Sequence, residues 1–187
     1  MFDKSFEDLI DIEDYTDKEL EKIQRIIEQD EDENPLYELE LVYRGQPKAA
    51  PRPKVNRANA TMYDPGQKDK KMLKSFIIEQ LDDIDNFKLI EGEIDIELKI
   101  YIPMIKSIRD SKVKRYLAES GKLRPLTRPD IDNYEKTVYD AINGVVFVDD
   151  SQIVDVRAEK YYSIIPRIEI KLTYREKPLK CSINKKK

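Results

Sequence analysis

The chain has 187 residues, 34 basic and 38 acidic side chains, and a formal net charge of −4. Its length suits one domain with a short appendage, and no apolar run approaches the roughly 20 residues that a membrane helix needs. It has no histidine and one cysteine, Cys181, which excludes Ser-His-Asp triads, His-ligated zinc, internal disulfides and multi-cysteine metal sites. Since the N-terminus also lacks a secretory signal, we expect a cytoplasmic protein with no membrane partner.

The charge is unevenly distributed. Residues 1–40 carry 16 acidic and 4 basic side chains, a net charge of −12, whereas residues 41–187 carry 22 acidic and 30 basic ones, a net charge of +8. A basic body is typical of nucleic-acid-binding proteins. We therefore divide the chain into an acidic N-terminal extension (1–35), a domain (36–176) and a basic C-terminal tail (177–187). The extension is interpreted as a solubiliser or as an electrostatic brake that lies over the basic face.

The first half of the chain predicts two helices and a strand. Thr16 and Glu19 have the spacing of a capping box, and the apolar residues that follow predict a helix near 16–29, before an acidic linker. Residues 36–44 alternate between apolar and polar and predict a strand. A Pro- and Ala-rich loop follows, and Asp64 is predicted to cap a helix that runs to about residue 82.

The second half predicts most of a sheet. Residues 93–102 alternate strictly and form the clearest strand. The basic segment 103–128 is expected to be helical in its middle and to stop at Gly121. The remaining predicted elements are a helix that ends at Asn143-Gly144, a short buried strand over 144–148, and strands over 153–163 and 167–174 that form a hairpin. The predicted fold class is α/β (α+β mixed), a small mixed β-sheet packed with helices.

Two pairs of carboxylates indicate metal chemistry. Asp130 and Asp132 are two residues apart in front of a helix, where their side chains point the same way and repel unless a cation neutralises them. A hard divalent ion, Mg²⁺ or Mn²⁺, suits such oxygen ligands. Asp149 and Asp150 follow one helix and one strand later and can return to the same end. Lys136, one turn after Asp132, can reach the same side. This set fits metal-dependent phosphodiester hydrolysis.

Each of these residues also has a structural interpretation. Asp132 can be a helix N-cap and Asp130 a turn residue. Asp149 and Asp150 can form a polar turn, and Lys136 can lie on a solvated helix face. If the turn does bind a metal ion, we expect only one of its two carboxylates to be a ligand, because neighbouring side chains usually diverge.

The segment 128–155 closely resembles the central motif of the RusA-like Holliday junction endonucleases. That family has Asp-x-Asp-Asn, a lysine four residues past the second aspartate, a helix ending in Asp-Ala-Leu/Ile-Asn, and Asp-Asp-x-Gln-(Ile/Val). The matching residues here are Asp130, Asp132, Asn133, Lys136, Asp140 to Asn143 and Asp149 to Ile153.

The resemblance implies a small mixed α/β fold and a Mg²⁺-dependent homodimeric nuclease that resolves four-way DNA junctions by paired nicks in recombination and repair. It implies that Asp130, Asp132 and Asp150 are catalytic metal-binding carboxylates, with Asp149 as their neighbour, and that Lys136 is an essential lysine. The acidic extension and the long basic segment 103–127 depart from the compact family pattern.

Two basic segments are candidates for contact with the phosphates of branched DNA. The residues are Arg44, Lys48, Arg52, Lys54, Arg57, Lys112, Lys114, Arg115, Arg124 and Arg128. Four tyrosines are candidates for stacking on opened bases, although each alone also fits half-buried packing. They are Tyr63, Tyr101, Tyr116 and Tyr134.

Two other functions compete with this hypothesis. One is a PD-(D/E)xK nuclease site that combines Pro129-Asp130 with Glu169-x-Lys171 or, out of order, with Glu97-x-Lys99. The other is a non-catalytic DNA-binding protein on the same fold, which would bind DNA without Mg²⁺ and would not nick it.

Overall fold

A four-stranded mixed sheet forms the centre of the protein. The computed structural model describes residues 15–51, 54–56 and 61–179. The strands lie in the order β1 (Leu36–Tyr43), β6 (Arg167–Arg175), β4 (Ile94–Pro103) and β5 (Ile153–Ser163). β6 is antiparallel to β1 and β4, whereas β4 and β5 are parallel. The predicted mixed α+β fold class is confirmed.

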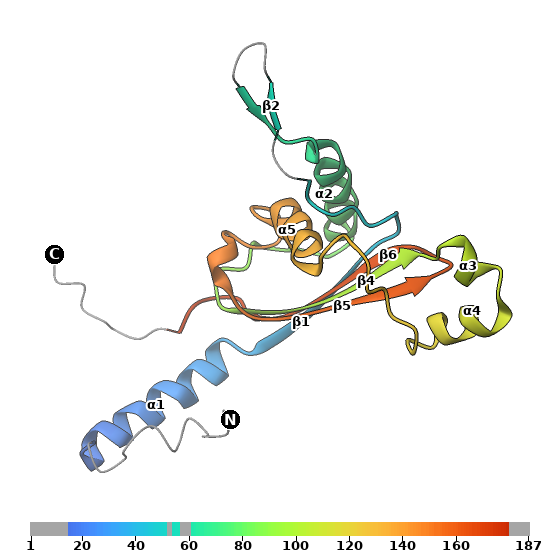
Figure 1. Cartoon of the computed structure of the whole chain (residues 1–187). Helices are drawn as coiled ribbons and strands as arrows, with labels where there is room; N and C mark the ends of the chain where they lie inside the picture. The colour runs from blue at the N-terminus through green and yellow to red at the C-terminus, as the bar shows by residue number, and fades with distance from the viewer. Residues whose placement is uncertain (1–14, 52–53, 57–60, 180–187) are drawn as a thin grey trace.

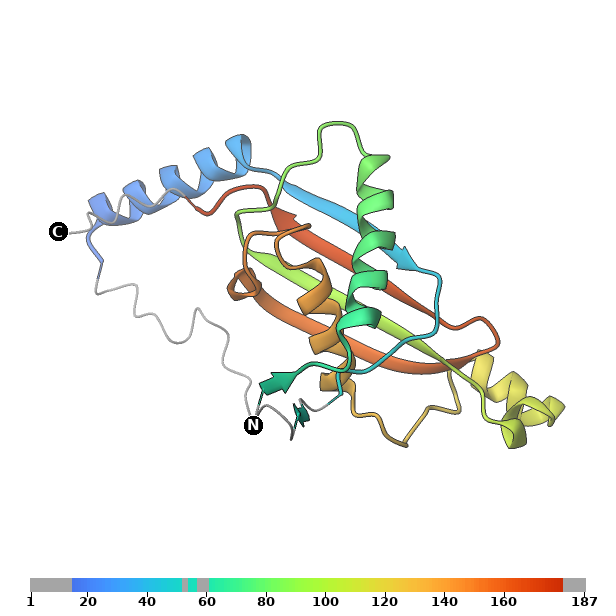
Figure 2. The same cartoon turned by 90° about the horizontal axis from the view of Figure 1, so that it is seen from above.

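Helices α2 (Gln67–Asp82) and α5 (Ile131–Ile142) pack on one face of this sheet, and no other described element covers the opposite, open face (Figures 1 and 2). The core lies between them. Alternate residues of β4 are buried, as the pattern over 93–102 predicts, and they meet the buried face of α5. Because burial of apolar surface is the main driving force of folding, this shared core holds α5 on the sheet. Within the described residues, no helix is long and apolar enough to cross a membrane.

Helix α1 (Asp17–Glu33) projects from the start of β1, away from the body (Figure 1). The predicted capping box is present, since the Thr16 amide donates to Glu19 Oε2 at 2.9 Å. The predicted linker over 30–33 is wrong, because these acidic residues form the last turn of the helix. α1 buries none of its residues, and its described part does not lie over the basic segments.

The loop predicted after β1 contains a small hairpin, formed by β2 (Lys54–Asn56) and β3 (Thr61–Tyr63). Asp64 does not cap α2 as predicted, because the helix starts three residues later. Its carboxylate instead accepts a hydrogen bond from the Gly66 amide at 2.8 Å and closes the turn in front of the helix.

The basic segment 103–128 is helical in its middle, as predicted. It folds into α3 (Lys106–Arg109) and α4 (Lys112–Glu119). The chain turns away from α4 at Gly121, which has a φ of +72°, a backbone conformation that glycine adopts without strain. The two helices lie at the end of the sheet away from α1 (Figures 1 and 2).

Two predictions in the C-terminal half are wrong. Residues 144–148 form a tight turn rather than a strand, because Gly144 at φ +68° reverses the chain at once and leaves Phe147 with single bridges to Ile90 and Asn143. β5 and β6 do not form a hairpin either, because β4 lies between them. The three residues 164–166 suffice to pass over one strand, since neighbouring strands are only about 4.8 Å apart.

Candidate functional site

Asp130 and Asp132 lie at the first turn of α5. Asp130, rather than Asp132, occupies the N-cap position with an extended backbone, and its side chain makes no capping hydrogen bond. Both side chains are exposed, and neither carboxylate forms an ion pair within the described part of the chain. The helix N-terminus, with its partial positive charge, favours negative groups at this position. The two carboxylates are therefore held outward and free to take a cation.

Lys136 is exposed one helical turn after Asp132, on the same face of α5. Its charge is one of the smaller causes that lower the pKa of Asp64, after the hydrogen bonds from Lys70 and from the Gly66 amide. Lys136 forms no ion pair with another described residue. Its ammonium group is thus available beside the carboxylates.

The segment that leads into α5 is anchored on β5. Lys160 Nζ donates to the carbonyl oxygens of Thr127 at 3.2 Å and Pro129 at 2.9 Å. Arg124 Nε donates to the Lys160 carbonyl at 2.6 Å. These contacts set the position of Asp130. The sequence alone did not identify Lys160, because a lysine within a strand has no local pattern that distinguishes it.

Asp149 and Asp150 lie in a turn beyond the other end of α5. Asp149 caps the short 3-10 helix η3 (Asp150–Gln152), and its amide donates to Gln152 Oε1 at 2.8 Å. The Gln152 amide group donates to the carbonyl oxygens of Ile90 and Gly92, both at 2.9 Å. Gln152 thus fixes the acidic turn to the chain in front of β4. The motif Asp-Asp-x-Gln contains this residue, but its role becomes visible only in the fold.

The two carboxyl groups of this turn influence each other's pKa. The Asp149 carboxylate is the main cause that raises the pKa of Asp150, whereas Asp150 and then the Ser151 amide lower the pKa of Asp149. The charge of Asp140, at the end of α5, adds to the rise for Asp150. Like-charge repulsion between adjacent carboxylates is relieved when a cation lies beside them.

The structure does not bring the two acidic pairs together within one chain. α5 has 12 residues, which corresponds to about 18 Å of helix between its ends. Asp130 and Asp132 lie at its start and Asp149 and Asp150 follow its end. Within the described residues, no group of three or more acidic, cysteine or histidine side chains is placed to hold a metal ion.

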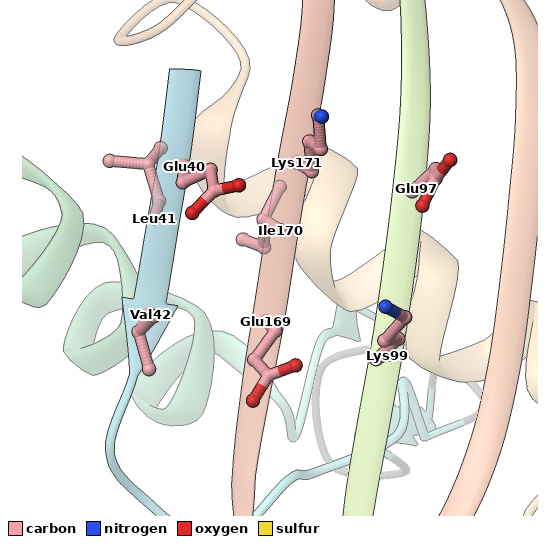
Figure 3. A pocket seen from close by; sticks show the side chains of 8 residues that line it. All are labelled: Glu40, Leu41, Val42, Glu97, Lys99, Glu169, Ile170 and Lys171. Atoms are coloured by element: carbon pink, nitrogen blue, oxygen red, sulfur yellow. The ribbon is translucent and has the colours of Figure 1, made fainter. Parts of the chain in front are cut away.

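The Glu-x-Lys pairs of the PD-(D/E)xK alternative lie on the open face of the sheet (Figure 3). Glu97 pairs with Lys171, and Lys99 pairs with Glu169, across the ladder between β4 and β6. Such opposite charges on neighbouring strands stabilise a sheet. Because α5 packs on the other face, the sheet separates these pairs from Asp130, and the alternative site is not formed.

The predicted DNA contacts divide into free and engaged side chains. Arg44, Lys48 and Arg128 are exposed, as are Lys112, Lys114 and Arg115 on α4. Arg52 and Arg57 lie outside the described residues, as does the side chain of Lys54. Arg124 is engaged, because it stacks on the Tyr161 ring at 3.6 Å and forms an ion pair with Glu159 at 3.6 Å.

The candidate tyrosines differ in the same way. Tyr101 stacks on Tyr161 with ring centroids 5.2 Å apart, and Arg167 covers its other face, so neither face is open to a base. Tyr134 is buried in the core, and the side chain of Tyr63 lies outside the described residues. Tyr116, 74% exposed on α4, is available for stacking.

Comparison with known proteins gives two findings. A family model described as endodeoxyribonuclease RusA matches residues 44–173. An uncharacterized protein of Bacillus subtilis (strain 168), YqaN, is 38% identical over 134 residues, which cover 71% of this chain and 93% of that protein. The matched region contains both acidic pairs, Lys136 and the whole four-stranded sheet except β1 and the last two residues of β6. The chain belongs to the RusA family of endodeoxyribonucleases.

Proposed function

We propose that the protein is a Mg²⁺-dependent endonuclease that resolves four-way DNA junctions and acts as a homodimer in recombination and repair. The observation that carries the proposal is the exposed pair Asp130 and Asp132, held outward on α5 with no basic partner among the described residues, in a chain of an endodeoxyribonuclease family. Phosphodiester cleavage requires neutralisation of phosphate charge, and a cation held by this pair supplies it.

The donor set suits Mg²⁺, with Mn²⁺ as a substitute. Mg²⁺ is commonly held by one or two carboxylates together with water and substrate phosphate oxygens, and Asp130 and Asp132 supply two carboxylates. Asp130 and Asp132 would hold the ion, which would supply a water of lowered pKa and neutralise phosphate charge. Lys136 would orient the attacking water or stabilise the negative charge that develops on the phosphate.

The arrangement of the dimer follows from the free edge of β5. Among the described residues, β5 pairs with β4 alone, and the segment around Arg124 covers the second half of its other edge. The first half, residues 153–157, is open, and the side chains of Val154 and Val156 are 66% and 43% exposed there. An open apolar edge strand is a typical site for pairing with another chain. We propose that it pairs with β5 of a second copy.

Such a pairing would complete the acidic site. A two-fold axis makes the two β5 strands antiparallel, so with residues 153–157 paired Ile153 of one strand lies beside Arg157 of the other, at the end of the open half. Asp149 and Asp150 precede the start of β5, and Lys160 of the later half holds the segment that ends at Asp130. The second acidic pair of one subunit would therefore approach Asp130 and Asp132 of the other.

The first test is cleavage of a synthetic four-way junction with Mg²⁺, compared with linear duplex of the same sequence. Wild type should nick the junction, and Asp132→Asn should nick it at least 100-fold more slowly. Asp95→Asn, a replacement of an exposed residue on the open face, should keep the wild-type rate. Junction binding without nicking by wild type would favour the non-catalytic DNA-binding protein. Absence of both binding and nicking would overturn the proposal.

The second test mixes two inactive variants. If Asp132 and Asp150 act from different subunits, a mixture of Asp132→Asn and Asp150→Asn contains heterodimers with one intact site, and nicking of one strand should return. If both residues act from the same subunit, every site in the mixture is damaged and the mixture stays inactive. That result, or a monomer in sedimentation at micromolar concentration, would overturn the shared site.

A further inference from the structure

Helices α3 and α4 form a projection at the end of the sheet, next to the ends of β4 and β5 (Figures 1 and 2). A small separate core holds it in place, formed by Met104, Ile108, Ala118 and Tyr162. Glu119 Oε1 also accepts a hydrogen bond from the Ile164 amide at 2.7 Å. The projection is therefore fixed to the sheet by packing and by hydrogen bonds.

The outer face of α4 exposes large apolar side chains. Val113 is 70% exposed, Tyr116 is 74% exposed, and Leu117 beside them is also exposed. Their spacing of three and four residues places them on one side of the helix, whereas Ala118 faces the small core. Exposed apolar residues that cluster on one face, rather than singly, mark a binding surface.

Basic side chains surround this apolar face. Six are exposed on or beside the two helices: Lys106, Arg109, Lys112, Lys114, Arg115 and Lys122. Within the described residues, only Arg109 forms an ion pair, with Asp110 at 3.6 Å. The two acidic residues nearby are Asp110, which pairs with Arg109, and Glu119, whose carboxylate is bound by the Ile164 amide. The projection therefore presents uncompensated positive charge around an aromatic and aliphatic centre, which is complementary to nucleic acid with exposed bases.

The projection also has a fixed position relative to the acidic residues of α5. The segment that connects α4 to Asp130 is held by the stacking of Arg124 on Tyr161 and by the hydrogen bonds of Lys160 to Thr127 and Pro129. A group bound by α4 would therefore lie at a constant offset from the site of cleavage.

We propose that α4 is a wedge that reads the branch point, in which Tyr116 stacks on an unpaired or unstacked base while Val113 and Leu117 pack against its neighbours. The surrounding lysines and arginines hold the adjoining phosphates. This inference rests on the proposed function, because it names the part of branched DNA that the projection recognises. It assigns junction preference to α4 and leaves bond cleavage to α5.

The test uses the Asp132→Asn chain, which should bind without cleaving, and a four-way junction with 2-aminopurine at the branch point. Binding should raise the fluorescence, because the base loses its stacking partners. Adding Tyr116→Ala should remove most of that rise and weaken junction binding about tenfold or more, with less than a threefold change on linear duplex. Tyr116→Phe should restore both, and Tyr15→Ala, an exposed tyrosine before α1, should have no effect.

An unchanged fluorescence rise in Tyr116→Ala, or an equal loss of affinity for junction and duplex, would overturn the wedge. So would a lower sedimentation mass of Tyr116→Ala than of wild type, which would make this face a contact between copies. Binding of wild type to anionic vesicles that Tyr116→Ala abolishes would also overturn it. If wild type cleaves junctions and Tyr116→Ala does so equally well, the wedge fails alone. If wild type neither binds nor cleaves them, the proposed function fails and the wedge fails with it.

Discussion

Lys70 of α2 binds Asp140 of α5 and so joins the two helices that cover the sheet. The same ammonium group binds Asp64, with its Nζ 2.7 Å from Oδ2. Burial lowers the pKa of Lys70, but the hydrogen bonds to Asp140 and Asp64 outweigh this and raise it above its usual value. The aspartate of the Asp-Ala-Ile-Asn motif therefore has a structural partner, and its presence in the motif does not require a role in catalysis.

Replacing Lys70 by methionine should lower the free energy of unfolding by about 1 kcal/mol at pH 7. Folding lowers the pKa of Asp64, so its contribution is present above about pH 4 and is lost as the pH falls through the folded pKa. Folding raises the pKa of Lys70, so its contribution is present below about pH 10 and is lost above it. The free energies of unfolding of wild type and Lys70→Met, measured by urea denaturation, should therefore differ at pH 7, and the difference should be smaller at pH 3. An equal difference at both pH values would mean that the variant loses packing rather than ion pairs. Lys71→Met, a replacement of an exposed lysine, is the control.

Replacing Tyr139 by phenylalanine should leave stability unchanged or raise it by about 0.5–1 kcal/mol. The Tyr139 hydroxyl is buried and has no hydrogen-bond partner among the described residues. Burial, and then the charge of Glu135, raise the pKa of Tyr139. Phe keeps the packed ring and removes the unpaired hydroxyl. Thermal denaturation measures the change, with Tyr15→Phe as an exposed control, and a loss above about 1 kcal/mol would reveal a buried water on the hydroxyl.

Local patterns predicted the elements that bury one regular face. Residues 93–102 alternate because β4 is central and packs on one side, and Tyr134, Val138 and Ala141 mark α5 because they share a single buried stripe. No local sequence pattern predicts the order of the strands in the sheet. A three-residue connection containing Pro166 fits a hairpin as well as it fits a step over β4, and only pairing between distant segments decides between them.

The candidate site shows the same limit. The motif identified Asp130 with Asp132, and Asp149 with Asp150, because each pair is close in sequence. Whether the pairs meet depends on the direction of α5 and on the edge that β5 presents, which are tertiary properties. Lys160 acts through two backbone carbonyls, and backbone contacts leave no pattern in a single sequence.

Replacing Gln152 by leucine should impair both stability and cleavage. The variant removes the Gln152 donor from the carbonyl groups of Gly92 and Ile90, of which Ile90 keeps the Val148 amide, and leaves the Asp149 amide without its acceptor, a loss of about 2 kcal/mol. Because Gln152 fixes the turn of Asp149 and Asp150, junction cleavage should fall by more than junction affinity. Chemical denaturation, cleavage and binding are compared with Ser151→Ala in the same turn. Normal cleavage at a temperature where the variant is folded would show that Gln152 does not position these carboxylates.

Replacing Lys160 by methionine should slow cleavage about tenfold or more while the protein stays folded. The variant keeps most of the aliphatic stem but frees the segment that ends at Asp130 from its two carbonyl contacts. Displacement of a reacting group by about 1 Å can cost 100-fold in rate. Single-turnover cleavage of a four-way junction measures the effect, with the exposed Lys88→Met as a control for charge. Raising the Mg²⁺ concentration should restore part of the rate if the fault lies in the placement of Asp130. A proportional loss of junction binding would instead make Lys160 a DNA contact.

Deleting residues 1–33 should leave the domain folded and change its affinity for DNA through charge alone. α1 buries no residue, and Asn34, which binds Arg175 and Lys177, is retained. Arg175 loses its ion pair with Asp30 at 3.5 Å but keeps the one with Glu93 at 3.1 Å. The deleted segment carries 14 acidic and 4 basic side chains, a net charge of −10. Its described part projects from the end of the sheet opposite α3 and α4. The deletion should therefore tighten DNA binding several-fold at low salt, and the gain should vanish near 0.5 M salt, where screening acts within about 4–5 Å. A gain that persists at high salt would mean that the extension covers the basic face directly, and no gain at any salt concentration would leave it a solubiliser.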